Sequence, residues 1–296
     1  MKESEKIQYT YESPYSGESY GERRLAAEYR EKEGTGYLTF PLFDSYSFVG
    51  HGFSSRIGGV SEGDFATMNL SYTRGDDPAR VTCNYERIGN ALGFSKEQLV
   101  LSDQIHETNV VYVTKKDCQG ESFYTKNLVG VDGLITDEKQ VVLATSYADC
   151  VPLFFVDPEH EAIGSAHAGW RGTVGEIGKK TICRMGEQFG SRPEELRVVI
   201  GPSICVSCYE VSEEVAEAFC AILPEEQTKK ILWKKDNGKY QLDLWMANRL
   251  ILENSGVLPE HIATADVCTC CNPTLLFSHR YTKGKRGNLN GFLWLE

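Results

Sequence analysis

Short apolar runs of strand-like length fill most of the chain between residue 37 and about residue 170, and helix-like periodicity becomes prominent only after them. The expected strands cover residues 37–40, 47–53, 98–106, 110–114, 132–137, 141–147, 151–157, 162–168 and 196–202. The expected helices cover about 173–189, 213–223 and 243–254. Because many strands arrive in succession before the long helices, instead of alternating with them, the pattern predicts a mixed sheet layered with helices.

This order of elements predicts the α/β class, in the form of a single three-layer α/β/α domain with a mixed sheet. A chain of 296 residues can bury one large core, and neither an internal repeat nor a Pro- or Ser-rich linker divides it. Residues 1–34 differ, because they are rich in Glu, Ser, Tyr and Lys and lack sustained apolar periodicity, with one short helix expected around Arg23–Lys32. We therefore expect a polar N-terminal extension over residues 1–34 and a catalytic domain over residues 35–296.

The charge and hydropathy of the chain exclude several classes of partner. A formal net charge of −11 disfavours broad binding to nucleic acid or to an anionic membrane surface, since both need dense positive charge. No apolar run approaches the roughly 18 residues of a membrane-spanning helix, and the polar N-terminus does not resemble a signal peptide. We expect a cytoplasmic protein that acts on a small molecule.

Two histidines and one cysteine stand at the ends of three expected strands. His106 ends one strand, Cys150 directly precedes a second, and His167 ends a third. Alone, each residue would more simply be a buried cysteine or a hydrogen-bonded structural histidine. Together, two imidazoles and one thiolate can hold a metal and leave its fourth position open, which is typical of catalytic zinc sites. The pattern therefore predicts a metalloenzyme.

The other cysteines offer weaker signals. Cys205 and Cys208 have CxxC spacing, but in the sequence no second pair supports this one. Cys268, Cys270 and Cys271 are too crowded to build a tetrahedral site unaided. We expect both sets to be structural.

Several motifs of the chain resemble those of the laccase-domain family, also called the YfiH type, peptidoglycan editing factor or purine nucleoside phosphorylase. These motifs are DQIH, ADCVPLFFVDP, HAGWRG, GPSI followed by CYEV, and a closing CT with FSHR and RG, and they run from about Phe48 to the C-terminus. The resemblance implies a single α/β/α domain with zinc bound by His106, Cys150 and His167, where copper could replace zinc. It also implies phosphorolysis of adenosine, inosine, guanosine and methylthioadenosine, together with hydrolytic deamination of adenosine.

Phosphorolysis needs a site for phosphate, and three segments offer one. Arg56 and Ser61 belong to an RIGGVS segment that resembles a family motif, where a guanidinium and backbone amides could converge on an oxyanion. Arg171 of HAGWRG opens the expected helix and suits an anion or, equally, a structural pairing with a carboxylate. The last family motif adds Ser278, His279 and Arg280 as candidate substrate contacts, within a basic run that could also be a solvated loop.

Two carboxylates are candidates for proton transfer, Asp149 beside the cysteine ligand and Asp132 at the start of an expected strand. A carboxylate near zinc can accept a proton from water or can hold a ligand histidine in place, and the sequence leaves both roles open. Two departures from the family pattern concern the rim of the site. Glu107 stands where glycine is frequent, and Tyr281 replaces a frequent second arginine.

Three other functions compete with this interpretation. A hydrolase that edits wrong amino acids out of peptidoglycan precursors could use zinc, or could use Cys150 as nucleophile with His106 or His167 as base. A multicopper oxidase needs about ten histidines for its copper centres, whereas this chain has six. A binding module without activity would leave the three convergent ligands unexplained.

Overall fold

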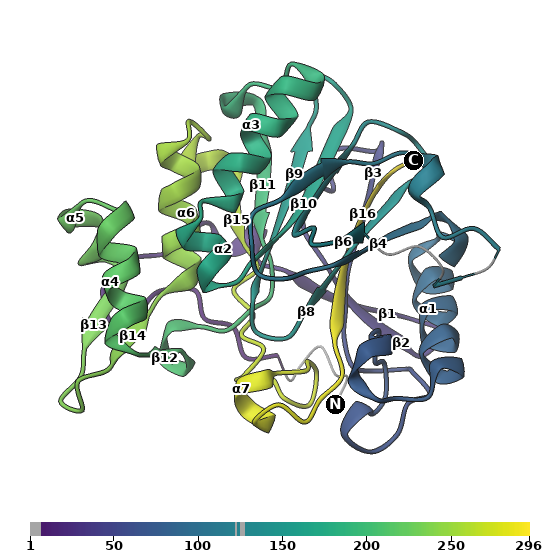
Figure 1. Ribbon diagram of the computed structural model, residues 1–296, viewed down its shortest axis with the longest axis horizontal. Coiled ribbons are helices and arrows are strands. Elements are labelled where there is room, and N and C mark those ends of the chain that lie inside the picture. Colours follow the sequence, from purple (N-terminus) through teal and green to yellow (C-terminus); the bar gives the residue numbers. More distant parts are fainter. Residues whose placement is uncertain (1–6, 122, 125–127) are drawn as a thin grey trace.

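The computed structural model describes residues 7–296 apart from residue 122 and residues 125–127 (Figure 1). Two large mixed sheets lie between outer helices. The seven-stranded sheet has the order β1 (Glu28–Lys32), β2 (Thr35–Thr39), β3 (Val49–Ser54), β16 (Leu289–Leu295), β8 (Val142–Tyr147), β4 (Leu99–Asp103) and β6 (Leu128–Val129). The six-stranded sheet has the order β15 (Ile262–Thr264), β11 (Arg197–Ile200), β9 (Val151–Asp157), β10 (Ala162–Ala168), β7 (Gly133–Thr136) and β5 (Val110–Tyr112).

The two sheets pack face to face, because their central strands carry apolar side chains on both faces. Every residue of β9, β10 and β16 is buried, which is typical of strands covered on both sides. Leu143 of β8 and Phe154 of β9 belong to one shared core. The hydroxyls of Thr145 and Ser165, one from each sheet, share a hydrogen bond of 2.8 Å. The middle layer of the expected α/β/α arrangement therefore consists of two sheets, and the predicted α/β class is confirmed.

Helices cover the outer faces of both sheets. α1 (Pro78–Leu92) packs on the seven-stranded sheet, whereas α2 (Trp170–Val174), α3 (Ile177–Phe189) and α6 (Leu244–Asn254) cover the six-stranded sheet (Figure 1). The remaining helices are α4 (Glu213–Ile222), α5 (Glu225–Thr228) and α7 (His279–Thr282). A small third sheet combines β12 (Glu210–Val211), β14 (Tyr240–Leu242) and β13 (Leu232–Lys234). This arrangement leaves the loops after β4, β8, β10, β11 and β15 free to build a site.

The prediction of a short helix around Arg23–Lys32 is wrong. A single 3₁₀ turn over Arg23–Leu25 is followed by β1, which pairs antiparallel with β2. β1 is a mostly exposed edge strand and therefore lacks the apolar alternation by which strands are identified in a sequence. Tyr20 is fully buried and its hydroxyl donates to Asp243, so part of the first 34 residues packs on the core.

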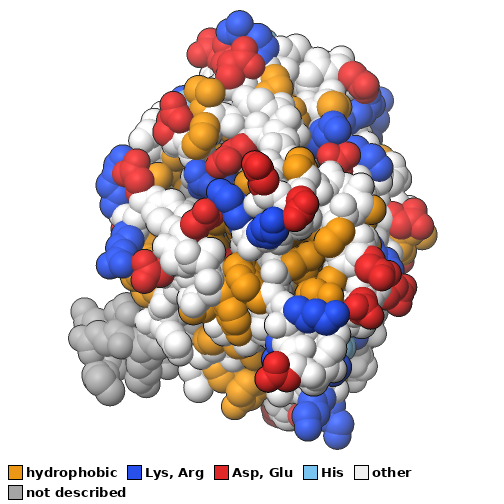
Figure 2. All heavy atoms as spheres, turned by 90° about the vertical axis from the view of Figure 1, so that its left-hand side faces the viewer, with side chains coloured by type: hydrophobic (Ala, Val, Ile, Leu, Met, Phe, Trp, Pro, Cys, Tyr) orange, Lys and Arg blue, Asp and Glu red, His pale blue; other side chains and the backbone are white. Residues whose placement is uncertain are grey.

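The surface of the described residues shows no broad basic face in the view that carries α4 and α5. Figure 2 shows Lys and Arg side chains interspersed with Asp and Glu side chains, with hydrophobic patches between them. Among the described residues, no helix is both long enough and apolar enough to span a membrane.

Candidate active site

The three sequence-predicted ligands, His106, Cys150 and His167, come together, and we refer to them as the His2Cys group. Their ligand atoms all lie within 4.8 Å of one another. β9 and β10 form an antiparallel hairpin in which Pro152 is opposite His167, so Cys150 lies next to His167 across the hairpin. His106 comes from the loop after β4, where its φ of 66° turns the chain toward the hairpin. The two imidazole rings meet edge to face with their centroids 4.8 Å apart.

Asp132 holds two members of this group in place. Its Oδ1 lies 2.9 Å from Nδ1 of His167, and the carboxylate also accepts the backbone N–H groups of Ile105, His106 and Glu107 at 3.0 to 3.1 Å. The side chain is fully buried. Burial raises the pKa of Asp132, but the hydrogen bond and charge of His167 and the backbone donors outweigh it and hold the pKa below its usual value. Because Nδ1 of His167 is occupied, Nε2 is the nitrogen left to bind a ligand.

Without a metal, the His2Cys group is a thiolate–imidazolium pair at neutral pH. Burial raises the pKa of Cys150, but His167 and His106 outweigh it and lower the pKa to about 6. Burial lowers the pKa of His167, whereas Cys150 and Asp132 raise it to about 9. The cysteine is therefore ready to act as an anionic ligand, and a metal would displace the proton of His167.

The surroundings of the group fit a metal ion. Gly169 follows β10, and a Cβ at this position would lie 3.0 Å from Cδ2 of His106 and 3.1 Å from Sγ of Cys150. A larger residue at position 169 would therefore push His106 or Cys150 out of place, whereas glycine does not. Two imidazoles and one thiolate, with a carboxylate behind one imidazole, are donors that suit zinc and also copper.

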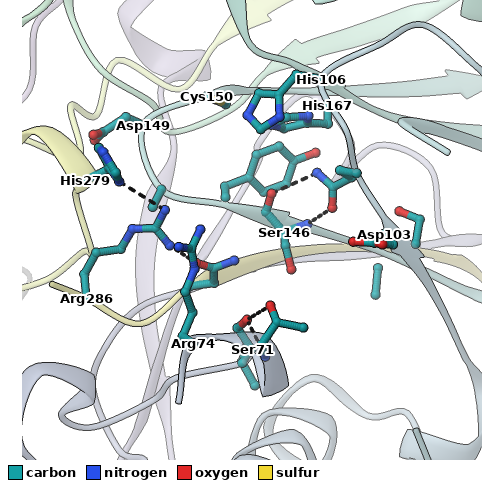
Figure 3. A pocket seen from close by; sticks show the side chains of 18 of the residues that line it. Ser71, Arg74, Asp103, His106, Ser146, Asp149, Cys150, His167, His279 and Arg286 are labelled. Atoms are coloured by element: carbon teal, nitrogen blue, oxygen red, sulfur yellow. Dashed lines mark hydrogen bonds between the residues drawn. The ribbon is translucent and has the colours of Figure 1, made fainter. Parts of the chain in front are cut away.

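The His2Cys group lines a cavity of about 580 Å³, a volume suited to a nucleoside-sized ligand. Figure 3 shows the two histidines on one side of the cavity, and Arg74 and Arg286 pointing toward each other on another side. Arg286 is buried, and its Nε has no hydrogen-bond partner among the described residues. Burial and the nearby Arg74 lower the pKa of Arg286 to about 10. His279 lies 3.5 Å from the guanidinium of Arg286. The two guanidinium groups make this corner of the cavity electropositive, and we refer to it as the electropositive corner (Figure 3).

Four other sequence-predicted residues also line this cavity: Asp149, Arg171, His279 and Arg280. Asp149 has a φ of 90°, and its carboxylate accepts the hydroxyl of Thr269 and the backbone N–H of Arg280, both at 2.6 Å. The guanidinium of Arg280 donates to backbone carbonyls of the 208–210 segment, and that of Arg171 stacks 4.2 Å from the ring of Trp170.

Arg56, Ser61 and Ser278, expected to contact phosphate or substrate, are not among the residues that line the cavity. Arg56 donates to the carbonyls of Ala66 and Pro273. The Ser61 hydroxyl donates to Asp76, and Ser278 caps α7. The glycines of the RIGGVS segment serve backbone packing, since a Cβ on Gly59 would lie 2.1 Å from the carbonyl oxygen of Thr67.

Arg74 and Arg286, which line the electropositive corner of the cavity, were not predicted as site residues from the sequence. Arg74 ends a 3₁₀ turn over Tyr72–Arg74 that carries no recognisable motif. Arg286 belongs to the basic run after α7, where the sequence does not distinguish a buried arginine from solvated lysines. The departures Glu107 and Tyr281 are exposed and do not line the cavity.

The cysteines expected to be separate structural residues also come together. The four-cysteine group consists of Cys205, Cys208, Cys268 and Cys271, whose Sγ atoms all lie within 4.8 Å of one another. The sequence signal was a second CxxC pair, Cys268 and Cys271, which Cys270 obscures. The described residues therefore hold two groups that could bind metal.

Comparisons with known proteins agree with the expected family. A family model described as multi-copper polyphenol oxidoreductase laccase matches residues 50–296. Purine nucleoside phosphorylase YlmD of Bacillus subtilis is 39% identical over 251 residues, which cover 83% of this chain and 88% of that protein. Purine nucleoside phosphorylase of Bacteroides thetaiotaomicron is 36% identical over 253 residues, which cover 85% of this chain and 93% of that protein. The crystal structure of YlmD from Geobacillus stearothermophilus superposes with a TM-score of 0.84 at 35% identity, covering 90% of this chain and 98% of that chain.

Proposed function

Because this chain belongs to the laccase-domain family, we propose that it is a zinc-dependent cytoplasmic purine nucleoside phosphorylase that also deaminates adenosine. One observation carries the proposal: a His2Cys group and a buried, partly unpaired arginine line the same cavity. The proposed substrates are adenosine, inosine, guanosine and methylthioadenosine. The names of the relatives, purine nucleoside phosphorylase, support this assignment.

The electropositive corner is the proposed phosphate site. Two guanidinium groups that face each other (Figure 3) repel, and an anion between them would relieve that repulsion. Nδ1 of His279 lies 3.5 Å from Arg286 and can accept its N–H, which would help to orient the guanidinium. These residues would hold phosphate so that one oxygen attacks C1′ of the ribose as the bond to the purine nitrogen breaks. The products are ribose 1-phosphate and the free base.

The remaining walls suit the nucleoside. Tyr72 and Tyr124 line the cavity with stacked rings 3.9 Å apart and give it an aromatic wall against which a purine can pack. Gln104 exchanges two hydrogen bonds with the backbone of Ser146, which fixes its amide at the cavity. Zinc at the His2Cys group would supply a Lewis acid for the departing purine and, in deamination, would lower the pKa of a water.

The two candidate carboxylates take different roles in this proposal. Asp132 is a positioning residue, because its oxygens are occupied by His167 and three backbone donors away from the cavity. Asp149 lines the cavity, and each of its oxygens accepts one hydrogen bond, which leaves lone pairs for a proton. We therefore assign proton transfer to Asp149.

A cysteine-dependent hydrolase, such as an editor of peptidoglycan precursors, is the second candidate function. The lowered pKa of Cys150 beside His167 supports it, because this pairing also activates thiol nucleophiles. A copper oxidase has less support. Among all six histidines, which lie within the described residues, only His106 and His167 belong to a possible metal-binding group.

The experiment incubates adenosine with the purified, zinc-loaded chain, with and without phosphate, and separates the products by chromatography. We expect adenine only when phosphate is present and inosine without phosphate, with both lost in Cys150→Ala. Cys183→Ser, which changes an exposed cysteine of α3, is the matched control and keeps both activities. Absence of both products from the zinc-loaded wild type contradicts the proposal and favours the hydrolase.

A further inference from the structure

The four-cysteine group lies where two neighbouring strands end. β11 and β15 pair in parallel, with Ile200 opposite Thr264, so the segments that follow them leave the sheet at the same edge. The pairing continues beyond the strands, because Ser203 bridges Cys268 and the N–H of Thr269 donates to the carbonyl of Ser203. Each segment then supplies one CxxC pair.

The geometry of the group suits one tetrahedral ion. Sγ of Cys271 lies 3.9 Å from Sγ of Cys205 and 3.5 Å from Sγ of Cys208. A zinc ion with four sulfurs at about 2.3 Å places those sulfurs about 3.8 Å apart. None of the four is in a disulfide, which would need sulfurs about 2.05 Å apart. In an iron–sulfur cluster the four thiolates are divided among two or four irons, so they do not all lie as close together as around one ion.

The backbone around the group is arranged as it is around metal-bound thiolates. Sγ of Cys268 faces two N–H groups, that of Cys205 at 3.2 Å and that of Cys271 at 3.4 Å. Such donors stabilise negative charge on sulfur. Cys205 and Cys268 are buried, so four uncoordinated thiols here would crowd polar sulfurs in the core with only weak mutual hydrogen bonds.

We propose that the four-cysteine group is a second, structural zinc site. All four ligand positions are filled by protein thiolates, which leaves no position open for substrate, as in closed structural zinc sites. The ion would join two walls of the cavity. The carbonyl of Cys208 accepts a hydrogen bond from Arg280 at 3.1 Å, and Thr269, beside Cys268, donates to Asp149. The zinc site would therefore fix the positions of Arg280 and Asp149.

The test measures zinc per chain by plasma mass spectrometry on the full-length protein purified with zinc and without chelator. We expect two zinc ions in the wild type, one in Cys150→Ala and one in Cys271→Ser. The matched control is Cys220→Ser, an exposed cysteine of α4, which keeps two. Cys270→Ser also keeps two, because Cys270 lies outside the group.

Several results would overturn the proposal. One is a single zinc in the wild type that Cys150→Ala loses, and another is an intact mass that reveals a disulfide between two of the four cysteines. A single zinc that Cys150→Ala keeps and Cys271→Ser loses supports this proposal and contradicts zinc at the His2Cys group, so the two failures are distinguishable.

If Cys271→Ser does not fold, cobalt replaces zinc in Cys150→Ala, which keeps the four-cysteine group intact. Cobalt bound by four thiolates gives intense charge-transfer bands in the near ultraviolet and strong visible bands. We expect these bands at one cobalt per chain, and their absence would overturn the proposal.

Discussion

The His2Cys group and the four-cysteine group both consist of side chains that could bind a metal ion, but they differ in the number of ligands and in their position relative to the cavity. The His2Cys group has three ligands, lines the cavity, and contains one exposed histidine, whereas the four-cysteine group has four ligands and does not line it. A carboxylate orients His167 of the first group, and two backbone N–H groups donate to the Cys268 sulfur of the second. An incomplete ligand set at a cavity predicts catalysis, and a complete set between two loops predicts stabilisation.

The largest expected effect separates the two groups by activity. Cys150→Ala should lower kcat/KM for phosphorolysis by about 10³-fold or more, equivalent to about 4 kcal/mol, because it removes a ligand of the open site. Cys271→Ser should lower kcat/KM much less, by about tenfold at a temperature where it is folded, because it only loosens the segments that position Asp149 and Arg280. Initial rates of base release measure both. Equal losses in the two variants would break the distinction.

The next effect concerns the carboxylate behind the His2Cys group. Asp132→Asn should weaken zinc binding there by about 10- to 100-fold, because it removes the charge that holds His167 and the His106 loop. Competition with a chromophoric chelator measures the affinity. Asp137→Asn is the control, since Asp137 is exposed and bonds to Tyr112. Unchanged affinity in Asp132→Asn would show that the ligands need no such support.

A substitution in the electropositive corner should change KM for phosphate and not KM for the nucleoside. Arg286→Met removes a charge-assisted donor worth about 2 kcal/mol, so KM for phosphate should rise about 30-fold while KM for the nucleoside changes little. Arg184→Met, on the exposed face of α3, is the control. Initial rates at varied phosphate provide the test. An equal rise in both KM values would place Arg286 at the nucleoside instead.

Loss of a ligand from the four-cysteine group should lower the thermal stability of the protein. Cys271→Ser should lower Tm by at least about 5 °C, since about 1 kcal/mol shifts Tm by roughly 2–4 °C in a large domain and loss of a structural metal is among the changes that cost more than a typical substitution. Differential scanning calorimetry with Cys220→Ser as control measures the shift. If Cys271→Ser had the same Tm as the wild type, the four-cysteine group would not stabilise the fold.

The smallest expected effect is a pH dependence of folding stability caused by the buried Asp243. Burial raises the pKa of Asp243 to about 6 despite hydrogen bonds from Met246 and Tyr20 that lower it. The folded state therefore binds more protons than the unfolded state between about pH 4 and pH 6, and the contribution of Asp243 to stability falls as pH rises through this window.

Urea denaturation of the wild type and Asp243→Asn measures this contribution at several pH values. The stability of the wild type relative to the variant should decrease from pH 4 to pH 6 and stay constant above. A constant difference across the whole range would show that Asp243 has an ordinary pKa.

The sequence predicts those parts of the molecule that local patterns determine. The His2Cys group could be predicted because His167 and Cys150 flank a hydrophobic hairpin whose register brings them together. The central strands β8, β9 and β10 were likewise predictable from their apolar runs. The polar edge strand β1 was not, because only its pairing with β2 determines it.

The rest of the site depends on contacts between distant segments. Arg74 and Arg286 come from separate loops, and neither has a neighbour in sequence that reveals their approach. Arg56 was predicted as an anion contact from a Gly-rich motif, whereas in the structure its guanidinium donates to the carbonyl of Ala66 and the glycines of the motif allow close backbone packing. The two CxxC pairs were visible in the sequence, but only the parallel pairing of β11 and β15 brings them together.

Phosphorolysis at the His2Cys group is tested most directly by incubating inosine and phosphate with the zinc-loaded wild type and with Cys150→Ala. Phosphorus NMR then measures ribose 1-phosphate, and chromatography measures hypoxanthine. We predict that the wild type forms ribose 1-phosphate in equal amount to the hypoxanthine released, and that Cys150→Ala forms neither above background. Hypoxanthine without ribose 1-phosphate, or undiminished formation of both by the variant, would contradict phosphorolysis at the His2Cys group.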